Sequence, residues 1–375
     1  MFGLIYLKKG THIFKRARRI KKQGLKKYSG NAEKICEHII EDCWDNKHKY
    51  FRVSTGNFPE FWSRDFSWVC ESLIKLGFKK QVKQTLEYAL EIFEKNNKIT
   101  TTISLKQKPF DFPYYAPDSL ASILKCLTLL KDKKPVNNHK NFLEKEIDRF
   151  YKTAIDKKTG LIRKDRYFSS MKDFSKRKSS CYDNCMAFII QNSSEKLKLK
   201  NPLKKYDYEK LIMKNFWKNN HFLDDLSGKD YIAGDANLFP FWSGLIKDKK
   251  IMKKAFESIK KEKLDKPLPL RYTTKDKDVR FIFWDMLIKD YEKDVVWTHM
   301  GLPYVELTGI IDKKLQEEYI KKYRELIEKY HNFPEVLKPN IDPYENFFYF
   351  CDGSMIWCAN YLWLSKNKEK IKDKK

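Results

Sequence analysis

Twelve segments of the chain space their apolar residues as helices do, and these segments alternate between two kinds. One kind is rich in aromatic and small residues and poor in charge, as in 65–76, 235–246 and 353–366. The other kind is amphipathic and charged, as in 314–331. A helix that is apolar all round must be enclosed, whereas an amphipathic helix exposes one face to water. The alternation therefore predicts an all-α fold with an inner ring of six enclosed helices and an outer ring of six half-exposed ones.

The connections between the helices indicate where a site would lie. The predicted helices are 31–45, 65–76, 78–94, 117–132, 139–155, 184–193, 206–218, 235–246, 249–262, 298–311, 314–331 and 353–366. Long loops precede most of the enclosed helices, at 95–116, 156–183, 219–234, 263–297 and 332–352. Long loops on a rigid scaffold commonly bear binding and catalytic residues. We expect these loops to open at one end of the double ring, and no series of strands is predicted.

The charge of the chain requires that a nucleic-acid partner be considered. Lys and Arg number 77 against 50 Asp and Glu, which gives a formal net charge of +27. The excess is mostly lysine spread through every segment, and lysine supplies charge without the geometry that reads base edges. We therefore expect no specific nucleic-acid partner. A basic RNA-associated protein remains an alternative, and it predicts polyanion binding that falls steeply with salt.

The basic residues also suggest how the chain is divided. The densest basic run, 8–27, lies outside the segments with motifs and predicts a basic N-terminal arm over 1–30. One helical domain is expected over 31–366, followed by a basic tail over 367–375. The eight cysteines include no Cys-x-x-Cys pair, so we expect reduced, buried thiols. The apolar start is broken at Lys8, and no run reaches the length of a membrane span, so a cytoplasmic protein is expected.

A polar cluster set among aromatic residues precedes each enclosed helix. The clusters are Trp62-Ser63-Arg64-Asp65, Pro117-Asp118-Ser119, Ser180-Cys181-Tyr182-Asp183-Asn184, Gly234-Asp235-Ala236-Asn237, Trp297-Thr298-His299, and Phe333-Pro334-Glu335 with Asp352-Gly353-Ser354. Each Asp taken alone can be interpreted as a helix N-cap. Together the clusters describe a cup of carboxylates and aromatic rings, which is typical of a sugar site. Cleavage of a glycosidic bond needs one protonated and one ionised carboxyl group.

The order and character of these clusters resemble the six-hairpin glycosidase clan, which includes glucoamylases, trehalases, processing glucosidases and neutral invertases. The resemblance runs from about residue 50 to 366 and is strongest at Trp62 to Asp65, Tyr182 to Asn184, and Phe333 to Trp357. It implies an (α/α)6 toroid that cleaves an α-glucosidic or related bond of an oligosaccharide with inversion. It also implies that Asp183, before the sixth helix, is the general acid and that Glu335, before the twelfth, is the general base.

The resemblance further implies contacts and geometry for the site. The expected substrate-binding residues are Trp62, Arg64, Asp65, Asp118, Tyr182, Asp235, Trp242, Trp297, His299 and Trp357. An inverting pair should have its carboxyl groups about 6.5 to 9.5 Å apart. Asp183 should lie against aromatic rings that raise its pKa, and Glu335 should be more solvated. The scheme requires no metal ion or cofactor.

Three further alternatives remain open. Asp118 is a rival to Asp183 as the general acid. The chain could also be an inactive toroid that binds carbohydrate or protein without turnover. A toroid enzyme of another chemistry, such as an epimerase or a lyase, would depend on His or Tyr as the proton carrier, and His299 is the histidine at a predicted helix start.

Overall fold

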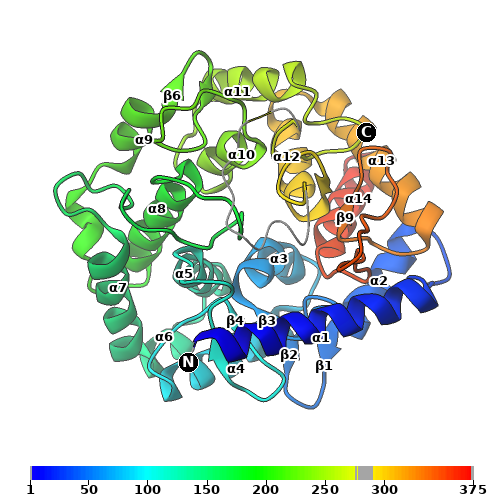
Figure 1. The fold of residues 1–375 in the computed structure, drawn as a ribbon, viewed down its shortest axis with the longest axis horizontal. Coiled ribbons are helices and arrows are strands. Elements are labelled where there is room, and N and C mark those ends of the chain that lie inside the picture. The colour runs from blue at the N-terminus through cyan, green and yellow to red at the C-terminus, as the bar shows by residue number, and fades with distance from the viewer. Residues whose placement is uncertain (1, 275–276, 278–289, 373–375) are drawn as a thin grey trace.

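The computed structural model describes residues 2–274, 277 and 290–372, and within it twelve helices form a closed double ring (Figure 1). The inner ring consists of α3 (Ser63–Lys75), α5 (Asp118–Leu130), α8 (Cys181–Lys196), α10 (Gly234–Trp242), α12 (Thr298–Ile311) and α14 (Cys358–Lys372). The outer ring consists of α2 (Ala32–Cys43), α4 (Lys79–Lys95), α7 (Lys140–Ala154), α9 (Tyr208–Phe216), α11 (Lys249–Lys261) and α13 (Lys313–Tyr330). Each inner helix packs on the next, and α14 closes the ring against α3. The predicted all-α double ring is confirmed.

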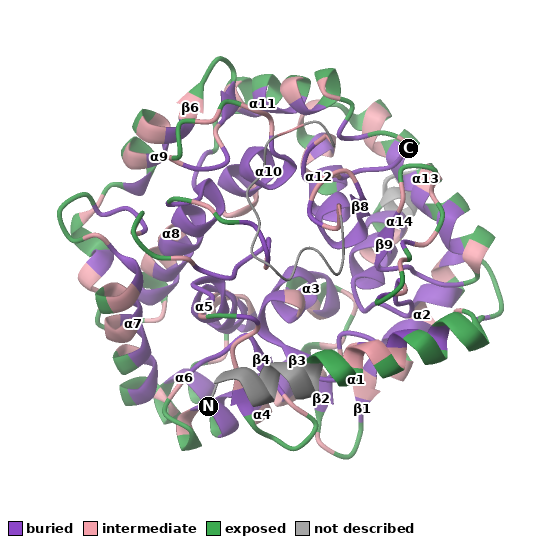
Figure 2. Ribbon diagram, in the orientation of Figure 1, coloured by how far each residue is buried: buried purple, intermediate pink, exposed green. Residues whose placement is uncertain are grey.

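Burial explains why the two kinds of helix take these places. In α10 every residue from Gly234 to Phe241 is buried, so this helix has no face that could meet water. In α11 the buried residues are Met252, Ala255, Phe256 and Ile259, which fall on one helical face and leave the lysines outside. Figure 2 shows the same division around the whole ring, with buried inner helices and exposed residues on the outer rim.

Short antiparallel sheets join the loops at one end of the ring, and the sequence did not predict them. They are β1 (Trp44–Asp45) with β2 (Tyr50–Phe51), β3 (Phe61–Trp62) with β4 (Thr102–Ile103) and β5 (Pro109–Phe110), β6 (Trp217–Lys218) with β7 (His221–Phe222), and β8 (Val296–Trp297) with β9 (Val336–Leu337). Two residues per strand are too few for an alternating pattern to be recognised. A short helix α6 (Lys133–Asn138) and a 3₁₀ turn (Pro202–Lys205) complete the described elements.

The N-terminal segment is not a separate arm. Residues Phe2–Gln23 form helix α1, which runs along the side of the ring that holds α2 and α4 (Figure 1). Ala17 and Ile20 on α1 are buried, and Arg16 forms an ion pair with Glu60 at 2.9 Å and donates to the carbonyl oxygen of Asn57. The expected boundary at residue 30 therefore does not separate α1 from the helical domain.

Three further expectations concern the C-terminal tail, the cysteines and membrane-spanning helices. Helix α14 continues to Lys372, so part of the predicted tail over 367–375 is helical, and its last three residues lie outside the described part. All eight cysteines are buried and free of disulfide bonds, as expected. Within the described residues, no helix is both long enough and apolar enough to cross a membrane.

Candidate functional site

A cavity of about 1020 Å³ lies at the end of the ring where the inner helices begin. Its lining comes from α1, from the starts of α3 and α12, and from the segments before α3, α5, α8, α12 and α14. Four carboxylic acids take part in this lining: Asp65, Asp173, Glu292 and Glu335. The loops 95–116, 156–183, 263–297 and 332–352 thus meet at one cavity, as the sequence predicted, whereas the loop 219–234 contributes no described residue to the lining.

The structure brings some of the predicted site residues to this cavity and leaves others behind it. The predicted residues that line the cavity are Trp62, Arg64, Asp65, Trp297, His299, Glu335 and Trp357. Those that do not line it are Asp118, Tyr182, Asp183, Asp235 and Trp242. The two groups differ in their hydrogen-bond and ion-pair partners.

Glu335 is held at the cavity by three hydrogen-bond donors. The strands β8 and β9 pair Trp297 with Val336, which places Glu335 beside the start of α12. Its carboxylate accepts from the hydroxyl of Tyr291 at 2.9 Å, from the hydroxyl of Tyr349, and from the backbone N–H of Asp352 at 3.1 Å. These donors favour the ionised form of the carboxyl group.

The electrostatics of Glu335 differ from the expectation. Its side chain was expected to be solvated, but the residue is only 2% exposed. Burial raises the pKa of Glu335 to about 8, with a further contribution from the negative charge of Asp352, while the three donors act in the opposite direction. The expected solvated base is therefore wrong, and the hydrogen bonds replace the water that would otherwise stabilise its charge.

Asp183 does not face Glu335 across the cavity. Its two carboxylate oxygens accept from the hydroxyls of Ser170 and Ser180, and its backbone N–H donates to Ser180 Oγ at 3.0 Å. Burial raises the pKa of Asp183, which agrees in direction with the expectation, while the charge of Arg177 and the hydrogen bonds from Ser170 and Ser180 oppose that rise. The side chain turns toward its own loop, because Ser180 caps α8 and Ser170 lies against that cap.

Asp173, ten residues earlier in the same loop, does line the cavity. It accepts from both terminal nitrogens of Arg64, at 3.2 and 3.3 Å, and from Ser169 Oγ at 3.1 Å. Burial raises the pKa of Asp173, and the charge of Arg64 partly opposes that shift. The sequence analysis missed Asp173, and the available signal was its position in a long loop that is rich in aromatic and hydroxyl side chains.

Glu292 is a second acid that the sequence analysis missed. Its carboxylate accepts from the backbone N–H of Phe174 at 2.9 Å and from Ser175 Oγ at 2.8 Å, so it packs directly against the segment after Asp173. Burial raises the pKa of Glu292 to about 8, and the negative charge of Asp173 adds to that rise. Two acids therefore lie side by side at this part of the cavity, and mutual repulsion favours a proton on one of them.

Asp118 and Tyr182 act on the cavity through Arg64. The Asp118 carboxylate forms an ion pair with Arg64 Nε at 2.6 Å, and the hydroxyl of Tyr182 donates to the same carboxylate at 3.0 Å. Asp118 is fully buried, so it is not exposed to a ligand in the cavity. Arg64 therefore contacts the buried Asp118 through Nε and Asp173 through its two terminal nitrogens.

Asp235 belongs to a buried ionic cluster behind the loop that bears Asp173. It forms ion pairs with Lys172 at 3.0 Å and with Arg177 at 3.1 Å, and Asp224 pairs with the same lysine at 3.0 Å. Lys172 immediately precedes Asp173 in the chain. The cluster therefore fixes the path of the loop, and Asp235 does not line the cavity.

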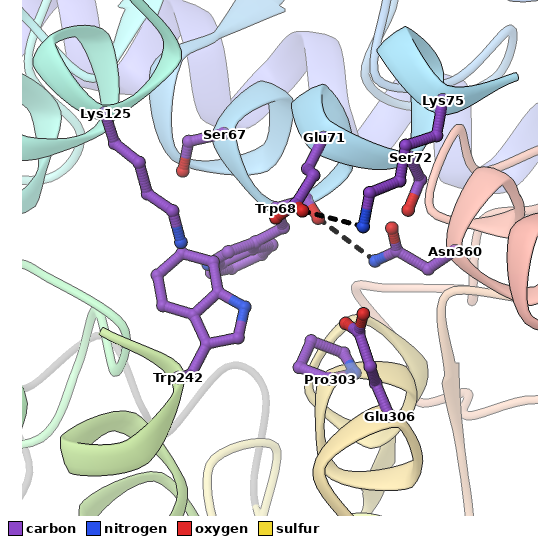
Figure 3. Close-up of a pocket in the computed structure, with 10 residues that line it drawn as sticks. All are labelled: Ser67, Trp68, Glu71, Ser72, Lys75, Lys125, Trp242, Pro303, Glu306 and Asn360. Carbon is purple, nitrogen blue, oxygen red and sulfur yellow. Dashed lines mark hydrogen bonds and ion pairs between the residues drawn. The ribbon is translucent and has the colours of Figure 1, made fainter. Parts of the chain in front are cut away.

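Trp242 lies at a different place in the ring. It is the last residue of α10, eight residues after Gly234, and that distance along a helix is about 12 Å. Its indole packs against Lys125 in a separate small pocket (Figure 3). The prediction that Trp242 forms a wall of the sugar site is wrong, because the residue is at the opposite end of its helix from the cavity.

His299 presents unpaired nitrogens at the cavity. Its ring stacks on Trp68 with centroids 4.2 Å apart and packs edge-on to Trp297 and Trp357. Burial holds the pKa of His299 well below its usual value, so the ring is neutral. In the described part of the chain, neither ring nitrogen nor the indole nitrogen of Trp357 has a hydrogen-bond partner. Buried polar groups normally have partners, so a polar ligand or water fits this part of the cavity.

No family model and no curated protein matches the sequence. Solved structures do match. A rhamnosidase from Klebsiella oxytoca with rhamnose bound has a TM-score of 0.65 at 8% identity, and the alignment covers 90% of this chain and 63% of that one. A bacterial glucoamylase complexed with acarbose has a TM-score of 0.60 at 14% identity, over 90% of this chain and 55% of that one. A mannosylglycerate hydrolase from Thermus thermophilus has a TM-score of 0.58 at 9% identity, over 89% and 99%. The chain thus has the (α/α)6 fold of the six-hairpin glycosidases.

Proposed function

We propose that this chain, which has the fold of the six-hairpin glycosidases, hydrolyses a glycosidic bond by an inverting mechanism, with Asp173 as the general acid and Glu335 as the general base. The observation that carries the proposal is the meeting of these two carboxyl groups, from the loops before α8 and before α14, at one cavity rich in aromatic rings. An α-glucosidic bond is the linkage that the sequence resemblance favours.

The surroundings of each acid include features that favour its proposed role. Glu335 receives only donated hydrogen bonds, and these stabilise the ionised carboxylate that must activate a water molecule. Burial raises the pKa of Asp173, and the negative charge of Asp118 adds to that rise, so its proton is retained more strongly than that of an ordinary Asp. For inversion, we expect the carboxyl groups of Asp173 and Glu335 to lie about 6.5 to 9.5 Å apart, which leaves room for the water.

Glu292 is the rival for the role of acid, and substitution separates the two. We expect Asp173→Asn to lower kcat/KM by about 10²- to 10⁴-fold on glycosides with poor leaving groups. The loss should be much smaller on glycosides with activated leaving groups, which need no proton. Asp183→Asn is the control, since Asp183 lies in the first turn of α8 and its side chain does not line the cavity. Circular dichroism should verify that each variant folds.

The experiment contradicts the assignment if the selective loss follows Glu292→Gln or Asp183→Asn instead of Asp173→Asn. The substrate panel should include α-glucosides and α-rhamnosides, and proton NMR should identify the anomer that is formed first. An initial product with retained configuration would contradict the inverting mechanism.

One observation favours the second candidate function, an inactive toroid that binds carbohydrate without turnover. Arg64 donates two hydrogen bonds to Asp173, and that arrangement stabilises an ionised carboxylate rather than a proton donor. Calorimetry with the same glycosides distinguishes the candidates, because this second function predicts heat of binding without release of product.

A further inference from the structure

The cavity is divided between a charged floor and an apolar rim. The floor contains the acids and Arg64; Glu335 is 2% and Glu292 is 3% exposed, whereas Asp65 and Asp173 are partly exposed. We call the opposite part the apolar rim, and its residues are Ile13, Phe14, Phe58, Phe112, Tyr114 and Phe348. Tyr114 is 43% exposed and Phe348 is 41% exposed, so the rim faces the outside.

The rim is part of an exposed apolar surface at the mouth of the cavity. Among the described residues, the large hydrophobic side chains that are exposed are Leu105, Tyr114, Ile310, Phe347 and Phe348. Two of these line the cavity, and Phe347 packs against Phe348 with ring centroids 4.9 Å apart. Apolar side chains that gather in the open commonly mark a binding surface.

Helix α1 is held in place as one wall of this rim. Ile13, Ala17 and Ile20 lie on one face of α1, toward the ring, and Phe14 packs near Phe348 with centroids 6.1 Å apart. The ion pair between Arg16 and Glu60, described above, holds α1 against the ring. In the described chain, α1 and the segment 112–114 contribute no charged side chain to the cavity lining.

From this division we infer that the substrate is a glycoside whose aglycone is an apolar alkyl or aryl group and not a second sugar. The inference rests on the proposed function, because the sugar would occupy the charged floor where its bond is cut. A second sugar would need hydrogen-bond partners for its hydroxyls, and of the six rim residues only Tyr114 has a polar side-chain group. An apolar aglycone gains from every methylene that it buries against such a surface.

The test is a series of glycosides that share one sugar and differ in the aglycone. Methyl, butyl, hexyl, octyl and phenyl α-glucosides, with the matching α-rhamnosides, are compared with maltose below their micelle concentrations. We expect KM to fall about fourfold for each added methylene until the rim is filled. Phenyl against hexyl separates a preference for flat rings from one for flexible chains, and either preference supports the inference.

Substitutions at the rim connect the effect to the structure. Phe14→Ala and Phe348→Ala should remove most of the dependence on chain length, so that the KM values of the butyl, hexyl and octyl glycosides become similar. Ile310→Ala is the matched control, because Ile310 is exposed on α12 and does not line the cavity. Equal KM values along the series, or a preference for maltose over octyl glucoside, would overturn the inference while leaving the proposed hydrolysis intact.

If no glycoside is hydrolysed, the proposed function fails, and calorimetry of the same series still decides the inference. A Kd that falls with chain length, and that loses this dependence in Phe14→Ala, supports an apolar subsite. A Kd that does not change with chain length overturns it.

Discussion

Replacement of Tyr349 by Phe removes one donor from the carboxylate of Glu335 and leaves the aromatic ring in place. The Tyr349 hydroxyl donates to Oε2 of Glu335, and the hydroxyl of Tyr291 and the N–H of Asp352 would remain as donors. A hydrogen bond to a charged group contributes about 1.5 to 3 kcal/mol. One pKa unit corresponds to about 1.4 kcal/mol, so we expect the pKa of Glu335 to rise by about 1 to 2 units.

The pH profile of kcat/KM measures this rise. The proposed base works when it is ionised, so activity is lost as the pH falls through the pKa of Glu335, which is about 8 in the native protein. In Tyr349→Phe this acidic limb should move to higher pH by about 1 to 2 units. At neutral pH, activity should therefore fall by about 10- to 100-fold, and it should recover toward the native value at alkaline pH.

Tyr344→Phe is the control, because the Tyr344 hydroxyl accepts from the side chain of Asn346, and the substitution keeps the ring that packs near both Tyr291 and Tyr349. Its acidic limb should stay in place. A uniform loss of activity at every pH in Tyr349→Phe, or an acidic limb that moves to lower pH, would refute the role of Glu335 as a base whose charge these hydrogen bonds stabilise.

Two further predictions concern stability. Lys172→Met leaves Asp224 and Asp235 with Arg177 as their shared partner in the buried cluster. We therefore expect urea titrations to show a free energy of unfolding that is lower by about 3 to 5 kcal/mol. A change below about 1 kcal/mol would show that the ion pairs of Lys172 are not needed for stability. The native pKa of Glu335 is about 8, above its ordinary 4.5, so the folded chain binds this proton more tightly than the unfolded chain. Its contribution to stability should therefore decrease as the pH rises from about 5 to about 8, and Glu335→Gln should flatten the corresponding fall in Tm.

The architecture could be predicted because it depends on local patterns. The spacing of apolar residues within a segment such as 249–262 records which face is buried, and this spacing survives without knowledge of the neighbouring helices. Observed boundaries differ from the prediction mainly where side chains cap a helix, as Ser180 does for α8. The basic residues of 8–27 indicate an exposed arm, but Ile13, Ala17 and Ile20 form an apolar face that packs α1 against the ring.

The sequence by itself determined the double ring, the end at which the loops meet, and the position of Glu335 before the last inner helix. Only the tertiary structure decided which acid of the loop 156–183 reaches the cavity. Asp173 and Asp183 are equivalent in type and lie in the same long stretch, but the serines of the α8 cap turn Asp183 inward while Arg64 draws Asp173 toward the cavity. Arg64 comes from a segment far from Asp173 in the chain, and a local pattern contains no record of contacts that form only when the ring closes.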